Sequence, residues 1–337
     1  MSKSLSACAI AIGLLFAGLD SASSANAPLE KLTVNVFPGG FNWPLFVARD
    51  KGFFTQQGLE VAAQPTTGSV AQMSGLASGK FDIAMTAVDN IVAYVEGEGD
   101  KSVGKQPDFF GFMGSDSGFL SLVSVPEIKS IGELRGKTLL VDARSTGYAF
   151  VLYDMLRRAG FKRTDYRVVP AGGMVQRWAA MQKNSGAATL LSTPFDILAK
   201  DKGFHQLSWA TQVIGPYQGN VAATKRAWAT AHRQEVLGYI RAYAAAIDWL
   251  YKPGNRDEAI RILRTNLPNM PEKLAEQTYG ELLDPKAGFF RNARVNMDGL
   301  QTVLRLRSTY GSGPKLDDPS RYYDASYWAD AMKALAK

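Results

Sequence analysis

Short apolar runs alternate along the first two thirds of the chain with segments in which apolar residues recur at helical spacing. Apolar positions at i, i+3 and i+4 mark one face of a helix, and short apolar runs bounded by polar turns mark strands. The runs predict strands at residues 32–37, 59–63, 81–86, 109–113, 120–125, 138–141, 166–169 and 187–192. The helical spacing predicts helices at residues 45–54, from 66–69 to 77, at 145–159 and directly after 171–173. Strands that alternate with helices predict a mainly parallel, doubly wound sheet.

The strands fall into two sets, and the chain becomes mostly helical after residue 218. Helices are expected there at residues 234–251, 256–265 and 297–310. The two sets of strands share one spacing of glycine, threonine and aspartate around a strand, at Gly79, Thr86 and Asp89 and again at Gly186, Thr193 and Asp196. Two lobes with similar loops at their strand ends are what a protein with a ligand cleft needs.

Polar or glycine-containing turns follow the predicted strands. They lie at residues 39–40, 66–69, 86–90, 144–147, 172–173 and 193–194. Ligands of open α/β sheets bind outside the carboxyl ends of the strands. We therefore expect these turns, from both sets of strands, to line one cleft.

The turn "ARSTG" at residues 143–147 separates a predicted strand from a predicted helix and has two interpretations. Ser145 or Thr146 would cap the helix by accepting a hydrogen bond from a free backbone N–H of its first turn. The same free N–H groups and the helix dipole could instead bind an anion, with the two hydroxyls as further donors. The interpretations are compatible, and both remain open at this point.

The N-terminal segment has the pattern of a secretory signal peptide. Lys3 supplies a positive charge, residues 7–19 are uncharged and mostly apolar, and Ala25-Asn26-Ala27 fits a small-x-small cleavage site. The apolar stretch is too short to span a bilayer. We expect cleavage after Ala27 and export to the periplasm. Cys8 lies at the start of the apolar stretch, whereas a lipoprotein cysteine follows it, so we expect no lipid anchor.

Composition and charge argue against several classes of function. Lys and Arg number 38 against 31 Asp and Glu, a net charge of +7, but the basic residues are scattered and nowhere form a stripe, so we expect no nucleic-acid partner. Cleavage would remove Cys8, the only cysteine, and leave the mature chain without disulfides or thiolate ligands. His205 and His232 lack partners at metal-ligand spacing, so we expect neither a metal nor a cofactor.

No motif provides a site for catalysis. "GSDSG" at residues 114–118 does not match G-x-S-x-G, and two histidines make a Ser-His-Asp triad unexpected. We interpret this segment as a flexible crossing between the two lobes, because it lies between two apolar runs. "GLASGK" at 75–80 and "RGKT" at 135–138 are near phosphate loops in composition, but each lysine leads into a strand rather than a helix.

Three longer segments resemble one known family. They are "GGFNWPLFVARDKGFFTQQGLEV" at 39–61, "SGLASGKFDIAMTAVDN" at 74–90 and "IGELRGKTLLVDARSTGYAFVLYDMLRRAGF" at 131–161. They resemble the solute-binding proteins of nitrate-, sulfonate-, taurine- and thiamine-precursor-type ABC importers, and the likeness covers nearly the whole mature chain. In "SGAATLLSTPFD" at 185–196, alanine stands where the family has aspartate, a departure that bears on the ligand class rather than the fold.

The resemblance implies an α/β protein with a type II periplasmic binding protein fold, in which two doubly wound lobes and a helical C-terminal portion surround a ligand cleft. The first lobe would comprise residues 28–115 and 219–337, after the signal peptide 1–27, and the second lobe residues 116–218. The protein would capture a small anion, such as a sulfonate, carboxylate or aromatic acid, without covalent chemistry. It would act as a monomer and deliver the ligand to an ABC importer permease with its ATPase.

The expected ligand contacts lie at or beside the strand-end turns. They are Phe41, Asn42, Trp43, Thr67, Gly68, Ser69, Thr86, Asp89, Arg144, Ser145, Thr146, Gly147, Tyr148, Gly173, Arg177, Thr193, Pro194, Phe195, Gln218 and Asn220. Arg144 and Arg177 are the candidate charge partners of an anion, and the aromatic residues would form walls. Two other classes compete: an enzyme on the same fold using Asp89 or His205 as an acid–base group, and a sensor that presents its ligand to a membrane receptor.

Overall fold

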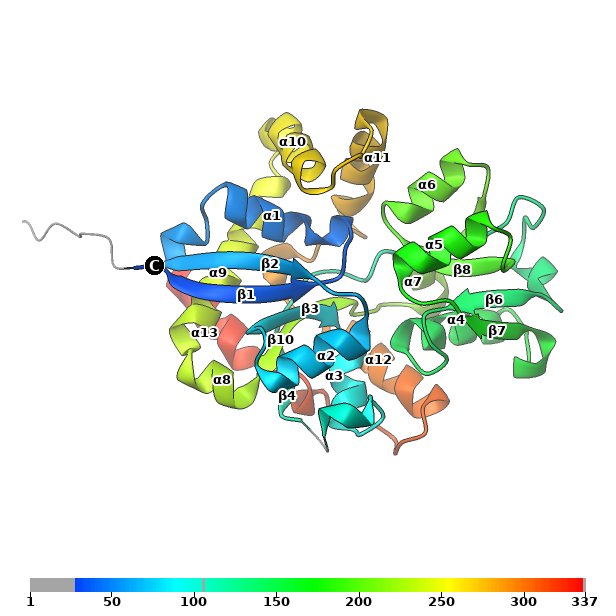
Figure 1. The fold of residues 1–337 in the computed structure, drawn as a ribbon, viewed down its shortest axis with the longest axis horizontal. Helices are drawn as coiled ribbons and strands as arrows, with labels where there is room; N and C mark the ends of the chain where they lie inside the picture. Colours follow the sequence, from blue (N-terminus) through cyan, green and yellow to red (C-terminus); the bar gives the residue numbers. More distant parts are fainter. Residues whose placement is uncertain (1–27, 105–106, 336–337) are drawn as a thin grey trace, which may run out of the picture.

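The computed structural model describes residues 28–104 and 107–335, which form two five-stranded sheets; the expected signal peptide lies outside the described residues. The strand order is β2-β1-β3-β10-β4 in the first sheet and β7-β6-β8-β5-β9 in the second (Figure 1). The strands of the first sheet are β1 (Glu30–Val36), β2 (Leu59–Pro65), β3 (Ile83–Ala87), β4 (Phe109–Gly114) and β10 (Asn220–Lys225). Those of the second are β5 (Leu120–Ser124), β6 (Thr138–Val141), β7 (Arg167–Pro170), β8 (Ala188–Ser192) and β9 (His205–Trp209).

The two sheets have the same internal order and the same mixture of directions. In the first, β1 pairs in parallel with β2 and β3, while β10 runs antiparallel to β3 and β4. In the second, β6 pairs in parallel with β7 and β8, while β5 runs antiparallel to β8 and β9. Thus β1 corresponds to β6, β3 to β8, and β10 to β5.

The antiparallel strands correct the sequence-based picture of a mainly parallel sheet. β5 and β10 are each the first strand after the chain passes from one sheet to the other. Such a strand enters its sheet on the side that faces the other lobe. The parallel strands end on that side, so the entering strand runs antiparallel to them. β9 and β10 were not predicted, and β10 interrupts the region after residue 218 that was expected to be mostly helical.

The two crossing segments, one between β4 and β5 and one between α7 (Ala210–Ile214) and β10, run side by side. The Gly219 N–H donates to the carbonyl oxygen of Asp116 over 2.8 Å. A Cβ atom at Gly219 would collide with the backbone of Gly118, so only glycine permits this close approach. The segment after β4 is therefore closely packed at the junction of the two sheets.

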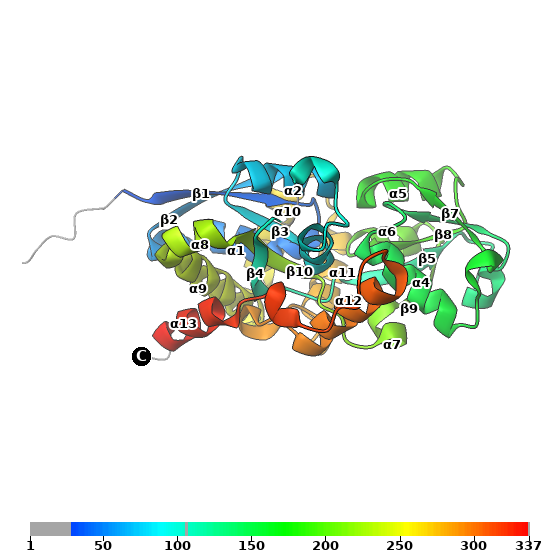
Figure 2. The same cartoon turned by 90° about the horizontal axis from the view of Figure 1, so that it is seen from below.

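Nine helices of the described chain belong with the first sheet and four with the second (Figure 1). The first group is α1 (Trp43–Asp50), α2 (Ser69–Ser78), α3 (Val88–Val95), α8 (Arg226–Ala231), α9 (Arg233–Leu250), α10 (Arg256–Asn266), α11 (Glu272–Leu282), α12 (Met297–Tyr310) and α13 (Ala325–Leu335). The second group is α4 (Gly147–Arg158), α5 (Met174–Gln182), α6 (Phe195–Asp201) and α7 (Ala210–Ile214). Helix α12 contacts both α3 and α4 and lies at the junction of the two groups (Figure 2).

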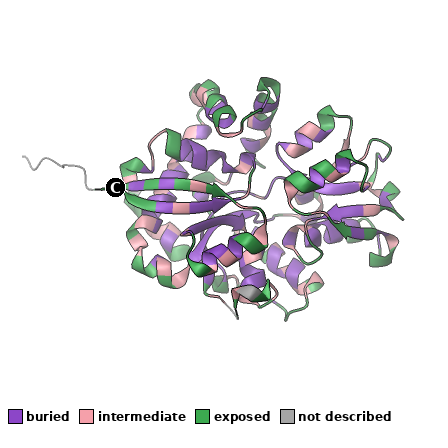
Figure 3. Ribbon diagram, in the orientation of Figure 1, coloured by how far each residue is buried: buried purple, intermediate pink, exposed green. Residues whose placement is uncertain are grey.

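Three apolar cores hold these layers together, and the buried residues concentrate on the strands (Figure 3). One core lies between the first sheet and helices that include α1 and α9. A second is continuous from α2 and α3 through α12 to β6 and α4, and so spans both lobes. A third covers the remaining face of the second sheet beneath α5. The expected α/β fold with two lobes is confirmed, and apolar packing links the lobes on the α12 side and through Ile197 of α6, which belongs to the first core.

In the described part of the chain, no helix is both long and apolar enough to cross a membrane.

Candidate functional site

Turns at the carboxyl ends of four strands meet where the two lobes face each other. The turn after β3 lies against the turn after β6, and the turn after β1 lies against the turn after β8. Because β1 corresponds to β6 and β3 to β8, the two contacts are equivalent by the internal repeat. We call them the Asp89 contact and the Asp196 contact, after the aspartate near the start of α3 and of α6.

In the Asp89 contact, α4 of the second lobe begins directly against a carboxyl group of the first. A Cβ atom at Gly147 would lie 2.5 Å from Cβ and 2.8 Å from Oδ2 of Asp89, so any larger residue would force the two turns apart. The protein's own carboxylate thus lies beside the first turn of α4, where the sequence predicted an external anion. An anionic ligand can reach this turn only when the lobes separate.

Arg307 of α12 completes the Asp89 contact. Its Nε and Nη2 donate to the two oxygens of Asp89 over 2.8 and 2.5 Å, and its Nη1 donates to Glu98 over 2.5 Å. Nη2 also donates over 3.2 Å to the carbonyl oxygen of Ser145 in the second lobe. Burial alone would lower the pKa of Arg307, but the two carboxylates outweigh it and raise the pKa. This buried network ties the lobes together with its charges paired.

In the Asp196 contact, the turn after β8 lies against η1 (Gly40–Asn42) and α11. A Cβ atom at Gly40 would lie 3.3 Å from the carbonyl oxygen of Thr193 and 3.5 Å from Pro194 Cδ. The Thr193 hydroxyl donates to Oε2 of Glu281 on α11 over 3.0 Å. Lys200 of α6 donates to the other oxygen of Glu281 over 3.3 Å.

The electrostatics of the Asp196 contact differ from those of its counterpart. Asp196 is 0% exposed, and neither carboxylate oxygen has a hydrogen-bond partner by distance and angle. Burial first, and then the neighbouring Glu281 carboxylate, raise the pKa of Asp196 to about 7, against smaller lowerings by Lys200 and by the backbone N–H groups of Ile197 and Asp196. No arginine takes the place that Arg307 takes beside Asp89.

Gln218 and Asn220 belong to the crossing segments rather than to an open ligand surface. The Gln218 side chain donates to the Asn220 carbonyl oxygen over 2.8 Å and accepts from Asn296 N over 2.8 Å. Asn220 Nδ2 donates to Oδ1 of Asp116 over 2.9 Å. Burial raises the pKa of Asp116 to about 6, although these donors oppose the shift. Both predicted ligand contacts therefore hold the lobe junction together in this conformation.

The two candidate arginines have different surroundings. Arg144 is exposed, and its Nη2 donates to the Val168 carbonyl oxygen over 3.2 Å. Arg177 is 3% exposed, and its guanidinium donates to the carbonyl oxygens of Gly172 and Leu190. The nearest acid recorded for Arg177 is Asp142, at 3.9 Å. Burial lowers the pKa of Arg177.

A small cavity lies beside Arg177 under the first turn of α4. Its volume is about 10 Å³, and its lining includes Asp142, Tyr148, Arg177 and Thr189 among apolar side chains. This volume is about that of one water molecule. Burial raises the pKa of Tyr148, so its hydroxyl stays protonated and can donate a hydrogen bond. Arg177, rather than Arg144, is therefore the buried positive charge near the strand ends.

The capping interpretation of the "ARSTG" turn is confirmed. Thr146 has an extended backbone conformation, and its hydroxyl oxygen accepts from Ala149 N over 3.4 Å, so α4 begins at Gly147 rather than at Ser145. The same hydroxyl donates to Oδ1 of Asp142 over 2.6 Å. Ser145 is exposed and contributes its carbonyl oxygen to Arg307.

Several other predicted contacts lie away from the meeting turns. Trp43 is 0% exposed, and its Nε1 donates to the Ala259 carbonyl oxygen over 3.0 Å, so it packs in the first-lobe core and cannot wall a ligand as expected. Asn42 is buried and donates to the Phe37 carbonyl oxygen over 2.6 Å. Phe41 and Phe195 are partly buried against the first and third cores, and Thr86 accepts a hydrogen bond from Asn90. The roles of Phe41, Thr86 and Phe195 in binding stay predictions.

The turns at the β2 and β7 ends remain open. Thr67 is exposed, and a Cβ atom at Gly68 would meet nothing within 4 Å; Ser69, the first residue of α2, is half-buried. Gly173, before α5, is half-buried and lies near the Gln176 side chain. No interlobe contact is recorded for these residues, so their proposed part in binding also stays a prediction.

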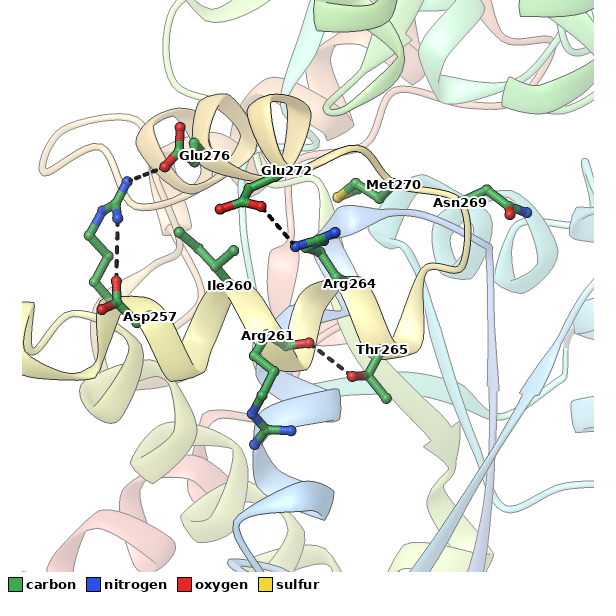
Figure 4. Close-up of a pocket in the computed structure, with 10 residues that line it drawn as sticks. Asp257, Ile260, Arg261, Arg264, Thr265, Asn269, Met270, Glu272 and Glu276 are labelled. Atoms are coloured by element: carbon green, nitrogen blue, oxygen red, sulfur yellow. Dashed lines mark hydrogen bonds and ion pairs between the residues drawn. The ribbon is translucent and has the colours of Figure 1, made fainter.

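A larger cavity of about 560 Å³ lies elsewhere, between α10 and α11 (Figure 4). Arg256 pairs with Glu276 over 3.3 Å, and Arg264 pairs with Glu272 over 3.4 Å. Its arginines are partly exposed and paired with acids, so this cavity lacks the buried, converging polar groups of a specific ligand site. Among the described residues, no group of three or more His, Cys, Asp or Glu side chains is placed to hold a metal ion.

The sequence did not identify two residues that organise these contacts. Arg307 lies 218 positions from Asp89, within a helix that otherwise reads as amphipathic. Glu281 lies on α11, a helix that the sequence analysis did not name. The one early signal was the repeated Gly, Thr and Asp spacing, which placed Asp89 and Asp196 at equivalent positions.

Comparisons with known proteins agree with this arrangement. The NMT1/THI5-like family matches residues 42–255, well over half of the chain. YtlA of Bacillus subtilis (strain 168), whose name describes a binding protein, is 34% identical over 135 residues, 40% of this chain. That match spans about two fifths (39%) of the length of YtlA.

Two solved structures extend the likeness to most of the chain. The periplasmic nitrate-binding protein NrtA of Synechocystis PCC 6803 superposes with a TM-score of 0.75 at 14% identity, covering 91% of this chain and 89% of that one. The alkanesulfonate-binding protein SsuA of Xanthomonas axonopodis pv. citri, bound to MOPS, has a TM-score of 0.68 at 15% identity, with 90% and 98% covered. At this level of identity the likeness shows a shared fold.

Proposed function

This chain belongs to the NMT1/THI5-like family, and on that premise we propose that it is the extracytoplasmic solute-binding protein of an ABC importer. It captures a small anionic solute between residues 28–115 with 219–337 and residues 116–218, and delivers it to a permease with its ATPase. The observation that carries the proposal is that turns at the strand ends of both lobes meet in two equivalent contacts, with Gly40 and Gly147 at the points of closest approach. A solute bound between them would be covered from both sides.

Selection of an anion rests on Arg177 and the first turn of α4. Arg177 is a buried guanidinium whose nearest recorded acid is 3.9 Å away, and Tyr148 places a protonated hydroxyl beside the same cavity. Helix α4 begins at Gly147, which lies against Asp89 on the interlobe side. When the lobes separate on the Asp196 side, a small carboxylate or sulfonate enters between them near Arg177 and is covered when the lobes rejoin.

Export is part of the proposal. The mature protein begins at Pro28 in the periplasm and carries no lipid anchor. N-terminal sequencing of the exported protein should return Pro28 as the first residue, and a lipidated Cys8 or an intact Met1 would contradict the proposal.

Thermal unfolding with a panel of solutes tests the function. The panel contains nitrate, aliphatic sulfonates, short carboxylates and aromatic carboxylates. A true ligand at a hundredfold excess over its Kd should stabilise the protein by about 2.7 kcal/mol. The ligand should be recovered unchanged, because a binding protein does not turn it over.

A matched pair of variants identifies the anion partner. Arg177→Lys should weaken the binding of that ligand, because a point charge replaces the planar guanidinium and loses its fixed geometry. Arg144→Gln should bind as the parent does, because Arg144 is exposed and bonded to Val168. Turnover of the ligand, or equal weakening by both variants, would contradict the proposal.

A further inference from the structure

Asp196 is a buried acid that the proposed binding reaction does not use. Both of its oxygens are covered and without a hydrogen-bond partner, in the turn of the second lobe that lies against the first. An ionised carboxylate without partners is unstable in such a place, and the group responds by holding a proton. The equivalent Asp89 avoids this by pairing with Arg307.

The charged groups around Asp196 come from two helices. Glu281 faces it from α11, and Lys200 and Asp201 lie on its own helix α6. Lys200 is already paired with Glu281, and Lys273 with Asp201. On β9, His205 is bonded to the Pro126 carbonyl oxygen, and η1 contributes no charged residue. The acid with the largest effect on the pKa of Asp196 is thus Glu281, on the opposite lobe.

We propose that Asp196 and Glu281 form a proton-linked latch between the lobes. While Asp196 holds its proton, the turn after β8 can lie against α11, and loss of that proton leaves two negative charges that push the lobes apart. The latch regulates access to the interlobe site, and in that respect it rests on the proposed function.

The latch lies where the turn after β8 meets α11. On the α12 side, one apolar core runs through both lobes. On the α11 side, Ile197 and Leu198 of α6 pack with the first-lobe core, and Thr193 donates to Glu281 across the junction. Asp196 is buried in this contact and neither of its oxygens has a hydrogen-bond partner, so loss of its proton leaves an uncompensated charge between the lobes.

The direction of the pH effect follows from where the proton is held more tightly. In the joined form the pKa of Asp196 is raised to about 7, whereas an exposed aspartate titrates near 4. The joined form therefore binds more protons between about pH 4 and 7. The population of the joined form relative to the separated form is therefore highest near pH 4. It falls as the pH rises to about 7 and stays constant above that.

Spectroscopic labels on both lobes measure the latch without any ligand. Val70 of α2 and Val175 of α5 are 49% and 48% exposed, and the mature chain has no cysteine of its own. Labels on Val70→Cys and Val175→Cys should report a larger separated fraction at pH 8 than at pH 5. Asp196→Asn, which is neutral at both pH values, should stay joined at both.

Two further variants separate the latch from other causes. Glu281→Gln should reduce the pH response, while Glu276→Gln on the same helix α11 should leave it as in the parent, because Glu276 is exposed and pairs with Arg256 inside the first lobe. An unchanged label distance in the parent between pH 5 and 8, or a parent-like response in Asp196→Asn, would overturn the latch. Solute binding is measured separately on the unlabelled protein, so a responsive latch without any bound solute would refute the proposed function and leave the latch standing.

Discussion

The Asp89 and Asp196 contacts occupy equivalent places in the two lobes and solve the burial of an acid in opposite ways. Asp89 is bridged by Nε and Nη2 of a buried guanidinium, which also reaches Glu98 and the opposite lobe. Asp196 has no such partner and lies next to a second acid instead. Apolar packing backs both contacts, so the difference between them is one of charge.

This difference assigns the two contacts different roles. A contact with paired charges suits a permanent junction about which the lobes move. A contact with an uncompensated acid suits the side that opens to admit a solute. The internal repeat therefore supplies two copies of one turn, and the partners of its aspartate decide which copy is fixed.

Among the substitutions considered, removal of Arg307 should lower the free energy of unfolding most, because it breaks the fixed contact. Arg307→Leu leaves Asp89 and Glu98 buried without their cation and should lower the free energy of unfolding by about 3–5 kcal/mol. Urea unfolding measures the change. Arg305→Gln on the same helix is the control and should cost less than about 1 kcal/mol, because Arg305 is 40% exposed and Asp154 keeps two other arginines. Equal costs would show that the buried network does not stabilise the junction.

Neutralising the two aspartates should change stability in opposite directions at pH 8. Asp89→Asn weakens charge-assisted bonds to Arg307 and should cost about 1.5–3 kcal/mol. Asp196→Asn removes an unpartnered charge and should raise the free energy of unfolding. The folded protein holds the Asp196 proton more tightly than the unfolded chain does, so the free energy of unfolding of the parent falls as the pH rises from about 4 to 7 and then stays level. The raised pKa of Asp116 adds a fall in the same direction up to about pH 6. A loss of stability in both variants would show that the two aspartates do not differ in how their charges are balanced.

A side chain at Gly147 should force the fixed contact open. Gly147→Ala places a Cβ atom 2.5 Å from the Asp89 side chain and should destabilise the protein by about 1–3 kcal/mol through overpacking. Gly68→Ala is a matched control at the start of α2, where a Cβ atom meets nothing within 4 Å. Thermal unfolding compares the two, and a harmless Gly147→Ala would show that the turns can separate freely there.

The Thr146 cap should have the smallest effect. Thr146→Val keeps the shape but loses the bond from Ala149 N, which should cost about 0.5–2 kcal/mol of stability. A calorimetric titration with the identified ligand then shows whether the hydroxyl also contacts it. If Thr146→Val and Ser145→Ala both bind as tightly as the parent, this turn is a cap alone.

The sequence predicted the alternating elements and the two lobes, because apolar periodicity and turn residues are local signals. Helix α12 has the predicted bounds, since its apolar face is regular along its whole length. Strands β9 and β10 were missed; β9 is half-buried along its length, and β10 enters its sheet by pairing with strands far away in the sequence. Their identity depends on those partners rather than on a local pattern.

The site was less accessible to sequence reasoning for the same physical cause. The turns at the carboxyl ends of strands could be named, but which of them meet depends on how the lobes are joined. Arg307 lies 218 positions along the chain from Asp89, to which it donates. Glu281 lies 88 positions from Thr193, from which it accepts. Trp43 appeared among the turn residues but packs inward, because its helix buries that face against α10 and α11.

The capture of a solute between the lobes is tested most directly by the labels at Val70→Cys and Val175→Cys at pH 8, with and without the identified ligand. The account predicts that saturating ligand shifts the distance distribution toward the joined form seen at pH 5. Tight binding that leaves this distribution unchanged would show that the solute binds elsewhere than between the two lobes.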